Sequence, residues 1–377
     1  MSVGDRRRSA ISWHGLADAA GPICFVAIPI VVTAIWALAA HRDHLFAANF
    51  HTSFWPAGDR VLHGRSPYLA TPDEIAEGIG FPYSAAAALF FVPFSLPPVG
   101  VGDAVFAILN IAALMLTLRV LRVSDYRVYG AVLLWLPVLS AWQLSNVTLL
   151  LGLGIAVVWR KRDRPAFAGI LLALLVSLKL FIWPVGIWLL ATRRYAACGW
   201  AIACGAVVNT AAWAILGFDQ IRLYLNLVKA VSRVQELKSY NVIAFGMHHG
   251  MDRSAAYALQ YAFAFAAAAY CVLLGSRHRD QAAFTVSVGL CLLFSPVVHL
   301  EYFALLVVPL ALARPRLSPA WLLPIAMLLP IAMFPQAEVP IVMASAAAVI
   351  ASVLRRSPPS SEPEALRSAE TIQGRTS

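Results

Sequence analysis

The chain has 377 residues, of which 60% are hydrophobic and 13% charged, and its mean hydropathy is +0.73. This composition excludes a water-soluble globular protein and predicts an all-α integral membrane protein with many spans. The net charge of +10 does not indicate nucleic-acid binding, because the basic residues stand in short clusters between apolar segments, as in cytoplasmic loops. The five cysteines lie inside apolar segments without CxxC spacing and are interpreted as packing residues.

An apolar run over residues 21–40 follows Arg6, Arg7 and Arg8 and predicts the first span. The run ends in Ala37-Leu38-Ala39, which faintly resembles a signal-peptide cleavage site. Its length suits a full crossing and favours a retained helix. Residues 1–20 are then a cytoplasmic N-terminal segment.

The loop over residues 41–80 is rich in polar and aromatic side chains, notably His51, Trp55, Arg65 and Tyr68, set among Gly and Pro. A connector between two spans needs only a few turn residues, so this loop predicts an ordered pocket at the water boundary. The alternative is an interfacial belt of Trp and Tyr.

Seven basic clusters hold 18 of the 29 lysines and arginines, and placing all of them in the cytoplasm requires an even number of crossings between neighbouring clusters. Only one apolar stretch lies between Arg164 and Arg193, so it must be a hairpin of two short helices. The proline-cut segment 81–98 is interpreted as re-entrant or interfacial.

About twelve spans result, several of them short, with both termini inside and a single membrane domain over 21–354. The tail over 355–377 is expected to be disordered and cytoplasmic. The predicted spans are 21–40, 101–118, 128–142, 146–159, 166–178, 181–192, 197–217, 255–274, 281–297, 300–313, 318–334 and 338–354.

On this topology the unusual polar residues gather on the outer face. Lys179 lies at the tip of the predicted hairpin, where an unpaired ammonium is costly unless it meets water or an anion. A phosphate partner explains it, and a lysine that snorkels to the outer surface explains it equally well.

Two further span junctions carry polar groups at the same level. His299 and Glu301 follow Pro296 and offer a general base or a ligand for an acceptor hydroxyl. The alternatives are a plain interfacial carboxylate for Glu301 and a simple polar cap for His299. Gln143 and Asn146 offer amides for sugar hydroxyls, although a polar turn needs such residues anyway.

The sequence predicts neither a metal site nor a bound cofactor. The histidine pairs of the outer loops lack Asp, Glu or Cys at ligand spacing, and no DxD pair stands in those loops. No P-loop, GxSxG, HExxH or dinucleotide fingerprint is present.

The order of several motifs along residues 40–310 resembles glycosyltransferase family 87, the actinobacterial α-mannosyltransferases that use polyprenyl-phosphate mannose and have the C-type membrane fold. The individual motifs are loose, but their order and spacing together are fairly specific. They read FHTSFWPAG, HGRSPY, FPYSAAAALFFVPFSLPP, WQLSNVTLLLG, AGILLALLVSLKLFIWP ending in LLATRR, SYN and SPVVHLEYF.

The resemblance implies transfer of mannose from the lipid-phosphate donor to an acceptor hydroxyl outside the cytoplasm, with inversion at the sugar carbon. It also implies substrate contacts from motif residues. These are His51, Trp55, Arg65, Tyr68, Tyr83, Gln143, Asn146, Lys179, Asn241 and Tyr302.

Two positions depart from the family pattern. Relatives usually carry Asp, the presumed base, where this chain has Asn49, and an amide cannot take a proton. The late motif often reads Ser-Pro-x-x-Trp-x-His-Tyr, so His299 fills the Trp slot and Glu301 the His slot. Either the base has moved, to Glu301 or Asp59, or the protein binds without catalysing.

The sequence therefore predicts a glycosyltransferase of the plasma membrane whose active site faces the extracytoplasmic side. Its partners are a polyprenyl-phosphate sugar, a glycolipid or polysaccharide acceptor of the cell envelope, and the lipid bilayer. The alternative is an inactive protein that binds or transports a lipid-linked sugar, although no repeated halves typical of a transporter are visible.

Overall fold

The computed structural model describes residues 21–328 and 338–355, and every regular element in these ranges is helical. Here η marks short 3-10 or π turns. The first elements are η1 (Ile23–Ala27), α2 (Ile28–Arg42), η2 (Phe50–Phe54), α3 (Trp55–Leu62), α4 (Pro72–Glu77), α5 (Ala85–Phe91), η3 (Val92–Ser95), α6 (Val99–Val120), α7 (Tyr126–Leu133), α8 (Leu136–Gln143), α9 (Thr148–Arg160) and α10 (Pro165–Leu178).

The second half of the chain continues the same pattern. It forms η4 (Leu180–Ile182), α11 (Val185–Ala191), α12 (Tyr195–Leu216), α13 (Gln220–Gln235), η5 (Glu236–Lys238), α14 (Val242–His248), α15 (Arg253–Ser276), α16 (Asp280–Leu293), η6 (Leu300–Leu306), α17 (Val307–Ala313), η7 (Pro319–Trp321), η8 (Leu323–Leu328) and α19 (Glu338–Leu354). Residues 1–20, the end of the span predicted over 318–334 and the tail from 356 lie outside the described residues.

Four helical stretches are long and apolar enough to cross a membrane, namely Ile23–Arg42, Val99–Val120, Tyr195–Leu216 and Arg253–Ser276. A fifth arises if α8 and α9, which meet at a bend of 115°, form one broken span. The other apolar helices have 10–17 residues, about 15–26 Å of helix against a hydrocarbon core of about 30 Å. The chain is an all-helical, multi-pass membrane protein, and the figure of twelve crossings stays a prediction.

Some of the predicted spans differ from the helices observed. The stretch 128–142 is not one helix, because the chain is extended at Trp135 and a new helix, α8, begins with Pro137 in its first turn. Proline suits that position, since a first-turn residue needs no hydrogen-bonded N–H. The span over 281–297 ends early, at Leu293, before Pro296.

The hairpin predicted between Arg164 and Arg193 is confirmed. Asp163, just before α10, lies 3.7 Å from Arg194, just after α11, so both ends of the segment meet and the chain reverses between them. Lys179 follows α10 directly, in extended conformation with φ −151° and ψ 108°, and occupies the tip.

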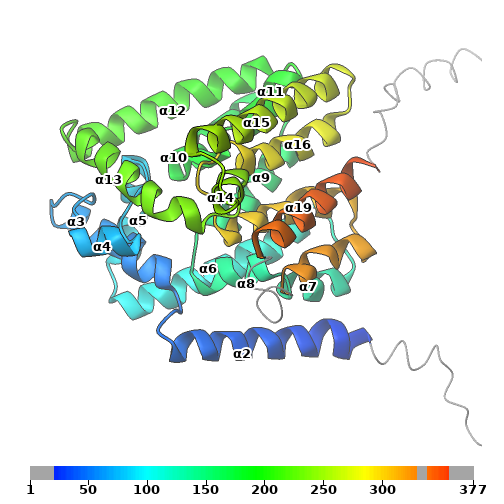
Figure 1. Ribbon diagram of the computed structural model, residues 1–377, viewed down its shortest axis with the longest axis horizontal. Helices are drawn as coiled ribbons and strands as arrows, with labels where there is room; N and C mark the ends of the chain where they lie inside the picture. Colours follow the sequence, from blue (N-terminus) through cyan, green and yellow to red (C-terminus); the bar gives the residue numbers. More distant parts are fainter. Residues whose placement is uncertain (1–20, 329–337, 356–377) are drawn as a thin grey trace, which may run out of the picture.

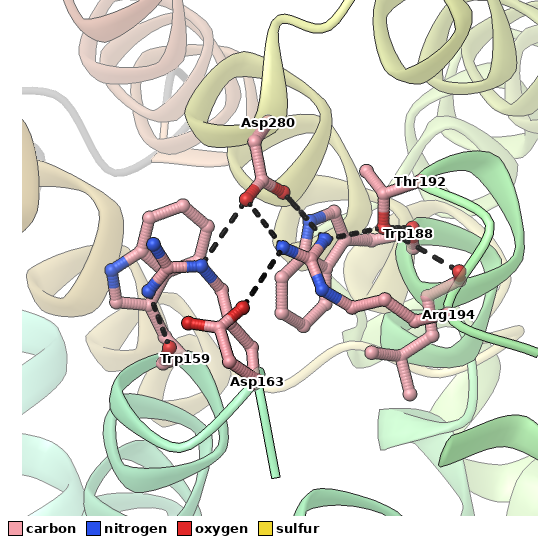
Figure 2. A network of polar contacts seen from close by, with 8 residues as sticks. Trp159, Asp163, Trp188, Thr192, Arg194 and Asp280 are labelled. Atoms are coloured by element: carbon pink, nitrogen blue, oxygen red, sulfur yellow. Dashed lines mark hydrogen bonds and ion pairs between the residues drawn. The ribbon is translucent and has the colours of Figure 1, made fainter. Parts of the chain in front are cut away.

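A polar cluster fixes the other end of this hairpin, as Figure 2 shows. Asp280, the first residue of α16, accepts two hydrogen bonds from Arg194 at 3.0 and 2.9 Å and one from Arg162 Nε at 3.2 Å. The indole of Trp188 donates to the same carboxylate at 2.6 Å. We call this cluster the Asp280 clamp, because it ties the ends of α9, α10, α11 and α16 together.

The bundle therefore has two different ends, the Lys179 end and the Asp280 end. Helices α3, α4 and α13 lie together on the left of Figure 1, where α2 and α12 also end. Aromatic side chains pack the segments that precede α6, with Phe54 stacked on Phe91 at 4.4 Å between ring centroids. This packing holds η2 and α5 beside the bundle.

Candidate active site

Lys179 is a buried cation with a neutral hydrogen-bond partner. Its side chain is 6% exposed, and its ammonium nitrogen Nζ donates to the amide oxygen of Asn146 at 3.2 Å. No carboxylate of the described residues lies within ion-pair distance of Nζ. An ammonium has three N–H donors, and burying it without an anion is costly. The lysine does not snorkel to the surface.

Asn146 connects this cation to a carboxylate. Its Oδ1 also accepts from the backbone N–H of Thr148 at 3.1 Å and from the Thr148 hydroxyl at 2.8 Å, which fixes the orientation of the amide. Its Nδ2 donates to Glu301 Oε1 at 3.2 Å. These contacts make Asn146 a bridge inside the protein and favour that role over a direct contact with sugar hydroxyls.

Glu301 is 4% exposed and lies in the first turn of η6, beyond the end of α16. The hydrogen bond from Asn146 is the only one to this side chain among the described residues, so its second oxygen, Oε2, has no partner there. A carboxylate whose one oxygen is held by an amide keeps the other for a ligand. The chain thus brings Lys179 and Glu301 to the same site from positions 122 residues apart in the sequence.

Aromatic rings enclose the ammonium. Nζ lies 3.9 Å from the centroid of the Tyr302 ring and 5.4 Å from that of Phe181, and these two rings stack at 4.6 Å. Tyr83 contributes a third ring at 5.6 Å and packs in turn on Phe54. Rings stabilise a cation through their negative faces and exclude water, so an anion bound at this site meets a strong local field.

The site therefore offers a cation and a carboxylate, held apart by an amide in a largely dry environment. The family model of glycosyltransferase family 87 matches residues 81–296, more than half of the chain and all of the segment that carries Tyr83, Asn146 and Lys179. The chain belongs to glycosyltransferase family 87. No curated protein and no solved structure gives a match.

Membership of family 87 makes the protein a membrane glycosyltransferase. Asn49, which directly precedes the motif FHTSFWPAG, lies beside the turn that carries Asn146, since its backbone N–H donates to the carbonyl of Leu144 at 3.1 Å. The Asn49 side chain is half-buried and makes no hydrogen bond among the described residues. Gln143 accepts from the indole of Trp36 at 2.5 Å and is engaged in helix packing.

Several predicted residues lie outside the cluster with partners of their own. Asp59 is paired with Arg65 at 2.9 Å and with His63 at 3.2 Å. Its carboxylate is thus already committed to two cationic or polar partners, which makes it a poorer base candidate than Glu301. His51 reaches Asp103 at 3.1 Å on an exposed surface.

The other predicted ligands have structural contacts. Trp55 donates to the carbonyl of Pro97 at 3.2 Å, and Tyr68 is buried against Trp213 at 5.7 Å between ring centroids. Asn241 donates to the carbonyl of Pro296 at 2.8 Å and caps α14. These contacts shape the loops around the site.

His299 remains at the edge of the cluster. Its ring meets Tyr302 edge to face at 5.4 Å and is half-buried. This position beside the aromatic wall allows contact with a ligand at Glu301.

Sequence reasoning missed three neighbours of the predicted residues. Thr148 orients Asn146, Phe181 faces the ammonium, and Asp103 lies in the first turns of α6, with its Oδ1 buried and unpaired. The lone acid of α6 was visible in the sequence, whereas the other two carry ordinary packing residue types. Within 21–328 and 338–355, no three His, Cys, Asp or Glu side chains gather as a metal site requires.

Proposed function

We propose that this family 87 protein transfers mannose or a related sugar from a polyprenyl-phosphate donor to a glycolipid or polysaccharide acceptor of the cell envelope. The reaction inverts the sugar carbon and takes place at the extracytoplasmic face of the plasma membrane. The observation that carries the proposal is the buried Lys179 ammonium, bridged by Asn146 to Glu301.

Lys179 suits the departing lipid phosphate. The ammonium has a single neutral hydrogen-bond partner, Asn146, and its remaining N–H groups are available to an anion. Negative charge grows on the phosphate oxygen as the bond to the sugar carbon breaks. A fixed cation in an environment of low polarity stabilises that charge more in the transition state than in the ground state.

Glu301 suits the acceptor side of the same reaction. Its free oxygen takes the proton of the acceptor hydroxyl, the hydroxyl oxygen attacks the sugar carbon, and the carbon–oxygen bond to the phosphate breaks with its electron pair on the phosphate. One displacement of this kind inverts the carbon. Asn146 holds Glu301 and Lys179 at opposite sides of the bridge, so the two groups do not neutralise each other by direct contact.

A transfer assay tests the proposal. The purified protein is incubated with radiolabelled decaprenyl-phosphate mannose and a lipid extract, and the products are separated by chromatography. We expect label in a new glycolipid or polysaccharide fraction. Label that stays entirely in the donor, with the protein folded and the donor bound, contradicts the proposal.

Asn49 supports a second function, that of a binder without transfer. The amide lies beside the turn that carries Asn146, at the position where relatives have the presumed base, and it cannot accept a proton. The discriminating variant is Asn49→Asp. If the parent is inert and this variant transfers label, the natural chain is a binding protein; if the parent is active, Glu301 is the better base.

A further inference from the structure

An apolar groove runs between α10, α11 and α12, with a cavity volume of about 400 Å³, within the usual ligand-pocket range of ~300–1,000 Å³. Its rim is formed by large apolar side chains that face outwards, with Trp183 42%, Leu190 52% and Ile202 74% exposed. Helix α12 is one of the membrane-length helices. The groove therefore opens sideways, toward the hydrocarbon of the bilayer.

Small residues create this space. A Cβ atom at Gly186 of α11 meets nothing within 4 Å, and one at Gly205 of α12 meets only Ala173, at 3.8 Å. Gly169 of α10 is different, because a Cβ there would lie 2.2 Å from the carbonyl oxygen of Ala197. Close packing of α10 on α12 requires Gly169, whereas Gly186 and Gly205 leave room that a larger side chain would fill.

The groove is polar at one end only. Asn209 donates to the Ser177 hydroxyl at 2.8 Å at that end, and Ser177 stands two residues before Lys179. The lining away from this pair is apolar and reaches Cys198, near the Asp280 end. The polar end of the groove is thus next to Lys179 in the chain, and an apolar slot that ends near a cation suits a molecule with an anionic head and a long apolar chain.

A second cavity of about 340 Å³ lies between α15, α16 and α19. It ends at Tyr240, Asn241 and Phe303, and Phe303 stands two residues after Glu301. A carboxylate repels a phosphate, while an ammonium attracts it. Charge therefore assigns a phosphate-bearing lipid to the first groove and not to this cavity.

We propose that the groove between α10, α11 and α12 holds the chain segment next to the phosphate of the lipid-phosphate donor, with the phosphate at Lys179. This inference rests on the proposed function and adds the side of the protein from which the donor enters the site. The chain slides in from the bilayer between α11 and α12, and the sugar reaches the site from the same direction.

Filling the groove tests the assignment. Gly186→Leu places a branched side chain in the open space of the groove. Gly199→Leu is the matched control, because Gly199 is an exposed residue of α12 that also has nothing within 4 Å of a Cβ atom and does not line the groove. Ala347→Leu fills the second cavity instead. Size-exclusion profiles show whether the three variants fold.

Donor KM is measured with a long polyprenyl-phosphate sugar and with a short donor that carries a methyl group in place of the polyprenyl chain. A side chain that displaces about two methylene groups of the donor from the groove is expected to weaken donor affinity by about tenfold. We expect Gly186→Leu to raise KM for the long donor by about tenfold and to leave that for the short donor within about twofold, with Gly199→Leu and Ala347→Leu unchanged. Equal behaviour of Gly186→Leu and Gly199→Leu, or an effect confined to Ala347→Leu, overturns the inference.

A binding experiment separates this inference from the proposed function. A sugar-free polyprenyl phosphate with a photoreactive group in its second isoprene unit is crosslinked to the wild-type protein, whether or not the protein transfers sugar. Crosslinks in peptides of α11 and α12 support the groove, even for an inert chain. Crosslinks confined to α15 and α19 contradict it, even for an active one.

Discussion

Glu301 is a buried residue whose second carboxylate oxygen has no hydrogen-bond partner among the described residues, so that oxygen is available to a ligand. The residue follows the break after α16 and lies in the first turn of the 3-10 helix η6. Its backbone position thus places a charged group at a helix junction and not in the middle of a long apolar helix.

Glu301→Gln is predicted to slow transfer by ~10²–10⁴-fold, the usual loss when a general base is removed. Gln keeps the acceptor for the Asn146 amide, so the fold and donor binding persist. Initial rates at saturating donor measure the effect, and a filter-binding assay measures donor affinity.

Asp59→Asn is the matched control, since Asp59 is paired with Arg65 away from the cluster. We expect it to retain near-normal transfer. A large loss in Asp59→Asn together with a normal rate in Glu301→Gln assigns the base to Asp59 and refutes the role of Glu301.

At the scale of helices, the Asp280 clamp explains how a hairpin of short helices keeps its register. One carboxylate receives hydrogen bonds from Arg162, Arg194 and Trp188, which belong to three different segments (Figure 2). Short helices have little intrinsic stability. Contacts that fix one end of the hairpin therefore help to hold the Lys179 tip in place at the opposite end.

Asp280→Asn is predicted to destabilise the protein by about 1.5–3 kcal/mol, the scale of hydrogen bonds to a charged group. Thermal unfolding in detergent, followed by tryptophan fluorescence, measures the change. Asp163→Asn serves as the control, because the Asp163 side chain is 76% exposed and its pairing with Arg194 is long, at 3.7 Å. An exposed pair of this kind contributes less than about 1 kcal/mol. Equal destabilisation by both substitutions would count against the clamp.

The hairpin was predictable because Arg164 and Arg193 flank a single apolar stretch, and two like-charged loops on one side of a membrane demand a reversal between them. The clamp was not, because the partners of Asp280 are set by the packing of segments distant in sequence. For the same reason Lys179 and Glu301 were recognisable as misplaced charges, whereas the Asn146 bridge and the Phe181 ring emerged only from the fold.

For the whole molecule, the basic clusters predict which end faces the cytoplasm. Arg162 and Arg194 of the clamp belong to clusters that are predicted to face the cytoplasm, and the Lys179 tip lies at the other end of the hairpin. The number of spans is harder to infer from the sequence. Length alone does not show whether a helix of 10–17 residues, or each half of a bent pair, crosses the membrane separately.

Single cysteines in a cysteine-free background test this orientation. Lys161, His63 and His249 are exposed and are replaced one at a time. In intact cells an impermeant maleimide is expected to label the variants at 63 and 249, while the variant at 161 reacts only after permeabilisation. Labelling at 161 in intact cells, with 63 and 249 protected, would show that the orientation is the reverse of the predicted one.

The central claim is that the Lys179 ammonium binds the phosphate of the sugar donor, and Lys179→Met tests it most directly. Methionine keeps an unbranched apolar side chain against Tyr302 and removes the charge. Transfer is measured against donor concentration for the wild type and for the folded variant. Loss of a desolvated charge contact is predicted to weaken donor use by about 2–5 kcal/mol. An unchanged dependence of transfer on donor concentration would contradict the claim.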